Sequence, residues 1–209
     1  MATNIELLQG QPIITFATAD KFQQWLDQHH ATSIGLWLQI AKKGCREETV
    51  SYADALDVAL CFGWIDAQKR PVDERYWLQR FTPRRSRSRW SKINCAKVEV
   101  LIAAGRVQPA GLRAIEAAKA DGRWEAAYAG QATATVPADL QLALDQDPAA
   151  TAFFATLDKA NRYAILYRVN EPTRPETRAR RIEKVIAMLR AHETFHPVPQ
   201  RRTERSLGG

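Results

Sequence analysis

Arginine and tryptophan side chains crowd one stretch of the sequence, and these two residue types together can bind anions. Between Arg75 and Val98 there are eight Lys or Arg residues and no Asp or Glu. The whole chain has 30 basic and 23 acidic residues, so removing these eight leaves 22 against 23. A positive field confined to one stretch predicts an anionic partner more strongly than a diffuse basic excess does.

The same stretch supplies the groups that such a partner would need. Guanidinium groups pair with phosphate oxygens, and indole rings stack on bases or other planar groups. Trp77 is one of the indole rings in this stretch. An ordinary solvated basic surface is the alternative, and the charge pattern alone leaves it open. The predicted ligand-binding residues are Trp64, Asp66, Arg80, Arg84, Arg85, Arg87, Ser88, Trp90 and Asn94.

Asp66 is the candidate for acid–base chemistry, because its segment faces one that carries Arg80 and Arg84. It could act as a general base or orient a ligand. An ion pair that holds the local hairpin is the favoured interpretation, because structural pairs perturb carboxylates as readily as catalytic ones. The sequence has no Ser/His/Asp order, phosphate-binding glycine loop or nucleotide fingerprint. We therefore expect no catalytic residue, and an enzyme is the less favoured hypothesis.

One histidine motif and three cysteines have the ligand types of a metal site. Residues 192–196, HETFH, satisfy the H-E-x-x-H pattern, in which both histidines lie on one helical face. Pro197 follows at once, so the second histidine is expected beyond the helix end. Cys45, Cys61 and Cys95 form no CxxC pair and are typical of small buried hydrophobes. We expect neither a metal nor a cofactor.

Regular elements must position the basic stretch. Alternating aliphatic residues predict a strand over 34–40, and an apolar stripe predicts a helix that Ser51 caps and Gly63 follows. Segments 64–70 and 75–81, separated by a turn with Pro and Asp, predict an antiparallel hairpin.

The hairpin leads into a further helix, which Ser86 or Ser88 is expected to cap. Arginines would then surround a helix N-terminus, where unpaired N–H groups and the helix dipole attract anions. These arginines are Arg84, Arg85, Arg87 and Arg89. Pro109 starts the next helix, and a packed αα-hairpin is favoured over a DNA-binding helix-turn-helix.

The second half of the chain predicts helices only. Asp147 and Asp158 are expected N-caps, and a helix that contains Ile182 and Leu189 closes the series. The resulting division is an α+β domain over 1–124 with the basic hairpin and the αα-hairpin, a helical region over 125–196 and a disordered basic tail over 197–209.

Length and composition are those of an ordinary globular protein. At 209 residues, with 45% apolar and 25% charged residues, the chain can bury a core without disulfides. No apolar run approaches the ~20 residues of a spanning helix, and the first residues lack the features of a signal peptide. We expect a cytoplasmic protein with no membrane insertion.

Four blocks of the sequence form a specific combination: ALCFGWIDAQKR, RFTPRRSRSRWSKIN, LIAAGRVQPAGLRAIEAAKADGRW and ETRARRIEKVIAML. With them the chain resembles the YdeI/OmpD-associated family, also called the bacteriocin-protection family, from about Phe22 to about Leu189. The resemblance implies an α+β unit with a small antiparallel sheet, of the YjbR/CyaY-like kind, followed by a helical bundle. Its functional implication is association with an outer-membrane porin and protection against bacteriocins or cationic peptides.

The resemblance also marks individual positions. NEPTRPETR departs from the family, which often has an Ala-Lys pair there, so any role of that lysine is not carried over. The marked positions are Gly63, Trp64, Ile65, Asp66, Phe81, Pro83, Arg84, Arg85, Ser88, Trp90, Ser91, Asn94, Thr177, Arg178 and Arg181.

Three functional hypotheses follow. The leading one is a cytoplasmic protein of a stress or bacteriocin-protection type that binds an anionic ligand, either nucleic acid or a phosphorylated molecule, through the Arg/Trp-rich surface. The second is a protein-interaction module, in which that surface docks an acidic partner and the helical half supplies an apolar groove. The third is a small-molecule enzyme that uses Asp66 and Arg84.

Overall fold

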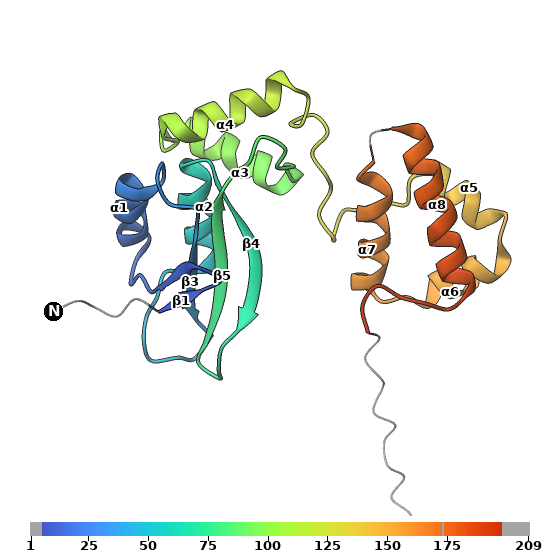
Figure 1. Cartoon of the computed structure of the whole chain (residues 1–209), viewed down its shortest axis with the longest axis horizontal. Coiled ribbons are helices and arrows are strands. Elements are labelled where there is room, and N and C mark those ends of the chain that lie inside the picture. Colours follow the sequence, from blue (N-terminus) through green and yellow to red (C-terminus); the bar gives the residue numbers. More distant parts are fainter. Residues whose placement is uncertain (1–5, 173, 198–209) are drawn as a thin grey trace, which may run out of the picture. The chain divides into compact units, whose positions relative to one another are not determined.

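The computed structural model describes residues 6–172 and 174–197 (Figure 1). Contacts divide the chain into two compact units, between Ala127 and Tyr128. The domain bounds predicted from sequence stay a prediction, and the basic tail lies outside the described residues except for Pro197. Within the described part, no helix combines the length and the apolar character needed to cross a membrane.

The N-terminal unit combines one sheet with four helices, which confirms the predicted α+β class (Figure 1). The described strands have the order β1-β2-β3-β5-β4 in the sheet. They are β1 (Leu7–Leu8), β2 (Gln11–Ile14), β3 (Leu36–Ala41), β4 (Trp64–Pro71) and β5 (Tyr76–Pro83). The helices are α1 (Ala19–His29), α2 (Tyr52–Cys61), α3 (Lys92–Ala103) and α4 (Pro109–Ala120).

The sheet is mixed, whereas the family resemblance implies a small antiparallel sheet. β2 and β3 run parallel, with Ile13 opposite Trp37. The reason is α1, which connects these two strands and returns the chain to the end of the sheet where β2 began, as a parallel connection requires. The predicted hairpin is confirmed, because β4 and β5 pair antiparallel, with Pro71 opposite Trp77.

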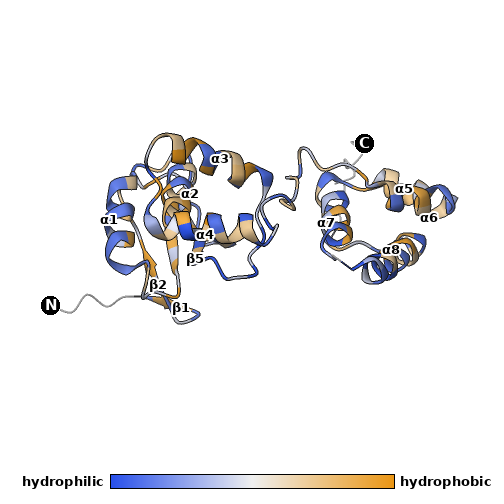
Figure 2. Cartoon of the chain, turned by 90° about the horizontal axis from the view of Figure 1, so that it is seen from above, coloured by the Kyte–Doolittle hydropathy of each residue, from blue (hydrophilic) through white to orange (hydrophobic). Residues whose placement is uncertain are grey.

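One core joins the sheet to the helices. The Ser51 hydroxyl caps α2 by accepting a hydrogen bond from the Asp54 N–H at 3.1 Å, as predicted, and Gly63 (φ 72°) then turns the chain into β4. Core side chains such as Leu38 and Phe81 are fully buried. Figure 2 shows the hydrophobic colour along the strands and the hydrophilic colour over much of α1, which is the pattern of a helix with one buried face.

The helices α3 and α4 of the predicted αα-hairpin both pack on α2. The turn before α4 docks on the end of α2, where the Gln108 N–H donates to the Cys61 carbonyl at 2.9 Å. Gly111 permits this approach, because a Cβ atom there would lie 2.2 Å from the Cys61 carbonyl oxygen. Figure 1 shows both helices beyond the end of the sheet where β5 finishes.

The described part of the C-terminal unit is helical. Asp147 and Asp158 are N-caps as predicted, accepting hydrogen bonds from the Ala150 and Asn161 N–H groups at 3.0 and 2.8 Å. The core contains Leu140, fully buried. The helices are α5 (Ala138–Asp145), α6 (Pro148–Thr156), α7 (Lys159–Asn170) and α8 (Pro175–Arg190).

Arg178, one of the positions marked by the family resemblance, joins three helices of this unit. Its guanidinium forms a two-pronged ion pair with Asp139 of α5, in which Nη2 and Oδ1 are 2.9 Å apart. Nη1 also donates to the Val169 carbonyl of α7 at 2.7 Å. The hydrogen bonds from Arg178 hold the pKa of Asp139 below its usual value of 3.8. This arrangement gives Arg178 a structural role.

The Asp139–Arg178 pair makes the stability of the C-terminal unit depend on pH. Since the folded pKa of Asp139 is lowered, its contribution is complete above the unfolded pKa near 4 and is lost as the pH falls through the folded pKa. We expect the α8 amides to lose protection from hydrogen exchange below about pH 4. This loss should be shallower in Asp139→Asn but unchanged in Glu183→Gln, which removes an exposed carboxylate. Equal pH profiles for all three proteins would contradict the prediction.

Candidate anion-binding loop

Residues 84–91, which connect β5 to α3, are called the arginine loop here. The loop begins where the Arg84 N–H donates to the Gly63 carbonyl at 3.0 Å. It ends at Ser91, whose hydroxyl accepts from the Asn94 N–H at 3.1 Å and caps α3. The helix thus begins later than a cap at Ser86 or Ser88 would place it. The chain stays irregular up to Trp90, whose side chain enters the core. The loop arginines therefore all precede the helix.

Arg84 points into the protein and lies on the Trp90 ring. The centre of its guanidinium is 3.5 Å from the ring centroid, and Nη1 donates to the Arg89 carbonyl at 3.0 Å. The Trp90 side chain is only 1% exposed, and the Trp124 ring lies 4.9 Å away from it. A guanidinium over an indole in a site shielded from water gains a strong cation–π attraction. Arg84 therefore holds the loop to the core.

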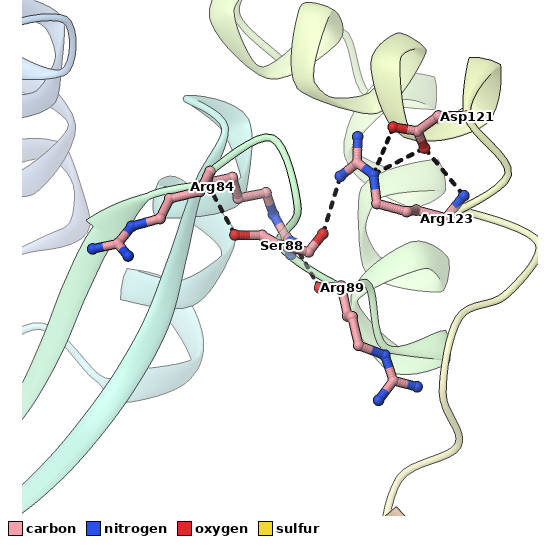
Figure 3. A network of polar contacts seen from close by, with 6 residues as sticks. Arg84, Ser88, Arg89, Asp121 and Arg123 are labelled. Carbon is pink, nitrogen blue, oxygen red and sulfur yellow. Dashed lines mark hydrogen bonds and ion pairs between the residues drawn. The ribbon is translucent and has the colours of Figure 1, made fainter. Parts of the chain in front are cut away.

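A second arginine, from outside the loop, fixes its middle (Figure 3). Arg123 Nη1 donates to the Ser88 carbonyl at 3.0 Å, while its Nε pairs with the Asp121 carboxylate at 2.8 Å. The Ser88 hydroxyl accepts from the Arg85 N–H at 2.9 Å. Hydrogen bonds from the Arg123 side chain lower the pKa of Asp121, because they favour the ionised carboxylate. The loop is thus held at its start, its middle and its end.

The cations on the outside of the loop and at the first position of α3 face solvent. Arg85, Arg87 and Lys92 are exposed. Among the described residues, no Asp or Glu forms an ion pair with any of them. The positive charge that the sequence concentrates here is therefore not neutralised by the chain's own carboxylates at these three positions. Exposed guanidinium groups on a braced loop can contact phosphate oxygens.

Of three other predicted site residues, two are buried and the third, Arg80, is half-buried. Trp64 is 1% exposed and Asn94 is 7% exposed. Trp64 Nε1 donates to the His30 carbonyl at 3.3 Å. Arg80 Nε donates to Gln11 Oε1 at 2.7 Å, so its guanidinium joins β5 to β2. The ligand role predicted for these residues stays a prediction, and the structure gives each of them an internal contact.

Asp66 has a different partner from the one expected. Its carboxylate accepts the Tyr52 hydroxyl at 2.9 Å, and this contact joins β4 to the first turn of α2. Within the described ranges, Asp66 forms no ion pair with Arg80. The observed partner of Asp66 is thus a neutral donor, and the contact holds β4 to α2 rather than to β5.

The histidines of the H-E-x-x-H motif do not share a helical face. α8 ends at Arg190, and His192 lies beyond it in a left-handed conformation (φ 59°). Its ring stacks on Phe153 at 4.6 Å, and the His196 N–H donates to Asn161 at 2.9 Å. This segment therefore closes over α6 and α7.

Two of the three cysteines are buried, as predicted, while Cys45 is partly exposed. Burial raises the pKa values of the Cys61 and Cys95 thiols above the ordinary value, so both stay protonated and unreactive at neutral pH.

Sequence reasoning missed the residues that brace the loop from outside, namely Asp121, Arg123 and Trp124. The motif DGRW follows α4, and nothing in its pattern shows that it returns to a loop about thirty residues earlier in the chain. An Arg-Trp pair directly after a helix end was the available signal. It becomes informative only when α4 is known to fold back beside the arginine loop.

Comparison with known families gives two matches in different parts of the chain. Residues 133–192 match the family described as Bacteriocin-protection, YdeI or OmpD-Associated, which confirms the predicted resemblance for this segment. Residues 14–114 match a domain of unknown function (DUF8412). Neither the curated proteins nor the solved structures that were searched contain a match. The expected likeness of the N-terminal unit to YjbR/CyaY-like proteins stays a prediction.

Proposed function

We propose that this protein binds a phosphate-bearing polymer, nucleic acid above all, through Arg85 and Arg87 of the arginine loop together with the neighbouring Lys92. The observation that supports the proposal is that the arginines differ in their contacts. Arg84 and Arg123 are used to brace the loop, whereas Arg85 and Arg87 face solvent. Bracing reduces the entropy that a loop loses when it binds, so an ordered loop binds more tightly than a mobile one with the same charges.

The form of the site favours a backbone contact over base recognition. The indole rings of Trp64 and Trp90 are buried, which leaves them no free face for a base. Binding would then rest on charge, and contacts to phosphates position a protein on nucleic acid without reading its sequence. We therefore expect affinity that depends weakly on sequence and strongly on salt.

Salt dependence provides the quantitative test. For duplex DNA, each phosphate contact contributes about 0.9 to the slope of log K against log salt. We expect Arg85→Gln and Arg87→Gln each to lower the slope by about one and the double variant by about two, measured by fluorescence anisotropy over a salt series. The control is Arg106→Gln, an exposed arginine beyond the far end of α3, which should leave the slope unchanged.

The same titration separates the proposal from its alternative, a module that docks an acidic protein partner. The C-terminal unit has a cavity of about 620 Å³ whose lining combines Phe154 and Leu166 with the basic Lys159 and Arg162. Such a groove would suit an acidic amphipathic segment. Binding of poly-glutamate without binding of DNA or RNA would overturn the nucleic-acid proposal in favour of the module, and salt-insensitive DNA binding would contradict it directly.

The biological setting that we propose is protective. Residues 133–192 match a family whose description names bacteriocin protection. We therefore place the anion-binding loop in a stress or bacteriocin-protection protein with a cytoplasmic location. The setting is tested by deleting the gene and exposing cells to bacteriocins or cationic peptides. Complementation by the wild type but not by the Arg85→Gln, Arg87→Gln double variant would show that protection depends on the loop. Equal complementation by both proteins would show that protection does not depend on it.

A further inference from the structure

A second basic site lies at the other end of β5. The end of β3 and the residues after it, the end of β4 and the start of β5 line an open cavity of about 620 Å³. Its lining residues are Ala41, Lys42, Lys43, Lys69, Pro71 and Trp77. It is separated from the arginine loop by most of the length of β5, roughly 20 Å at the rise of a strand. A cavity of this volume is in the usual range for a small-molecule site.

The register of the sheet places Lys69 beside Trp77, while Lys42 and Lys43 follow directly after the end of β3 at Ala41. Trp77 lies opposite both Ile40 of β3 and Pro71 of β4, and Lys69 pairs with Gln79, two residues further along β5. Because strand side chains alternate between faces, Lys69 and Trp77 share one face of the sheet. Lys69 Nζ indeed lies 4.3 Å from the centroid of the Trp77 ring. This geometry is fixed by strand register and does not depend on a mobile side chain alone.

The three lysines of the cavity are not paired with acidic side chains of the described chain. Lys42 Nζ donates to the Asp73 carbonyl, a neutral group, at 2.6 Å. In the part of the chain that the structure describes, no ion pair joins any of the three lysines to a carboxylate. The nearby Glu47 pairs with Arg75 at 4.0 Å. Three like charges around one cavity repel each other, and a bound polyanion would remove that repulsion.

The Trp77 ring adds a preference for a planar group. It is half-buried, with Tyr52 packed 6.0 Å away, and Lys69 covers part of its accessible side. At a partly exposed site, a lysine over an indole is a weak contact, whereas stacking of a base on an aromatic ring is stronger. A planar ring can therefore take the place of Lys69 on Trp77, and the released ammonium group can then bind phosphate.

We propose that this cavity binds a phosphorylated small molecule with a planar ring, a nucleotide in chemical class. The lysines hold the phosphate groups, each with donors to spare, since an ammonium group has three. The ring lies on Trp77, against the apolar edge formed by Ala41 and Pro71. This site uses none of the residues of the arginine loop, so it is independent of the proposed function.

Calorimetric titration of the full chain with ATP, tripolyphosphate and adenosine tests the site. We expect ATP to bind more tightly than tripolyphosphate by about tenfold, which is the contribution of the stacked ring, and adenosine to bind too weakly to measure. The Lys43→Gln, Lys69→Gln double variant should bind ATP at least about tenfold more weakly. Both lysines are exposed, so their replacement should leave the fold intact.

Two controls make the outcome specific. Lys184→Gln, at an exposed lysine on α8, removes a positive charge away from the cavity and should bind ATP like the wild type. The Arg85→Gln, Arg87→Gln variant should also keep its ATP affinity, while Lys43→Gln, Lys69→Gln keeps its DNA salt slope. ATP binding that the lysine variant leaves unchanged would overturn the proposal. Equal affinity for tripolyphosphate and ATP would refute the stacking on Trp77 and with it the nucleotide class.

Discussion

Replacing Gly111 with alanine is expected to destabilise the N-terminal unit by about 2–3 kcal/mol, an overpacking cost at the upper end of the usual range. The added Cβ would lie 2.2 Å from the Cys61 carbonyl oxygen and 2.9 Å from a methyl group of Val107. The first of these neighbours is backbone, so the clash can be relieved only by moving α4 away from α2. That movement would also break the Gln108–Cys61 hydrogen bond.

The direction of the stability change in Gly111→Ala distinguishes a packing clash from an effect of helix propensity. Helix propensity alone predicts that Gly→Ala within a helix stabilises by about 1 kcal/mol. The matched control is Ala117→Gly, at an exposed position of the same helix, which should cost about 1 kcal/mol by propensity. All six tryptophans lie at or before Trp124, so tryptophan fluorescence during urea unfolding reports the N-terminal unit selectively. A Gly111→Ala protein as stable as the wild type would show that α4 is not held against α2 as described.

Local signals predicted the elements of the fold well. The Ser51, Asp147 and Asp158 caps are found as expected, because a cap depends on one side chain and an N–H group three residues away. The β4–β5 hairpin follows for the same reason, since its turn residues lie between its strands. Information of this kind is contained in short windows of sequence.

The pairing of β2 with β3 could not be predicted in that way. The residues of β2 and β3 do not indicate which strand each one pairs with. The parallel arrangement depends on the path of α1 across the sheet. The same limit applies to the site. The sequence shows how many arginines the loop contains, but the direction of each depends on Trp90 and Arg123, which meet the loop only in the folded chain. Charge counting therefore identified the arginine-rich segment but assigned the inner and outer arginines the same role.

Replacing Arg84 with alanine is expected to lower the stability of the N-terminal unit by about 2–3 kcal/mol, the combined scale of a shielded cation–π contact and a hydrogen bond from a charged donor. The guanidinium lies on Trp90 and holds the Arg89 carbonyl, so its removal leaves a void beside the ring and frees the Arg89 end of the arginine loop. DNA affinity should fall as well, because a mobile loop loses more entropy on binding. Urea unfolding and the salt titration measure the two effects separately.

Lysine substitutions distinguish a bracing arginine from a contacting one. Arg84→Lys keeps the charge but loses the planar group that covers Trp90, so we expect it to restore little of the stability lost in Arg84→Ala. Arg85→Lys, at an exposed position, should keep both the stability and the salt slope, because an ammonium group still neutralises a phosphate. If Arg84→Lys instead matched the wild type in stability, a positive charge at position 84 would be sufficient for stability without the planar guanidinium group. If Arg85→Lys also lost DNA binding, a charge alone would not be sufficient at position 85. The division between inner and outer arginines, on which the proposed function rests, would then be wrong.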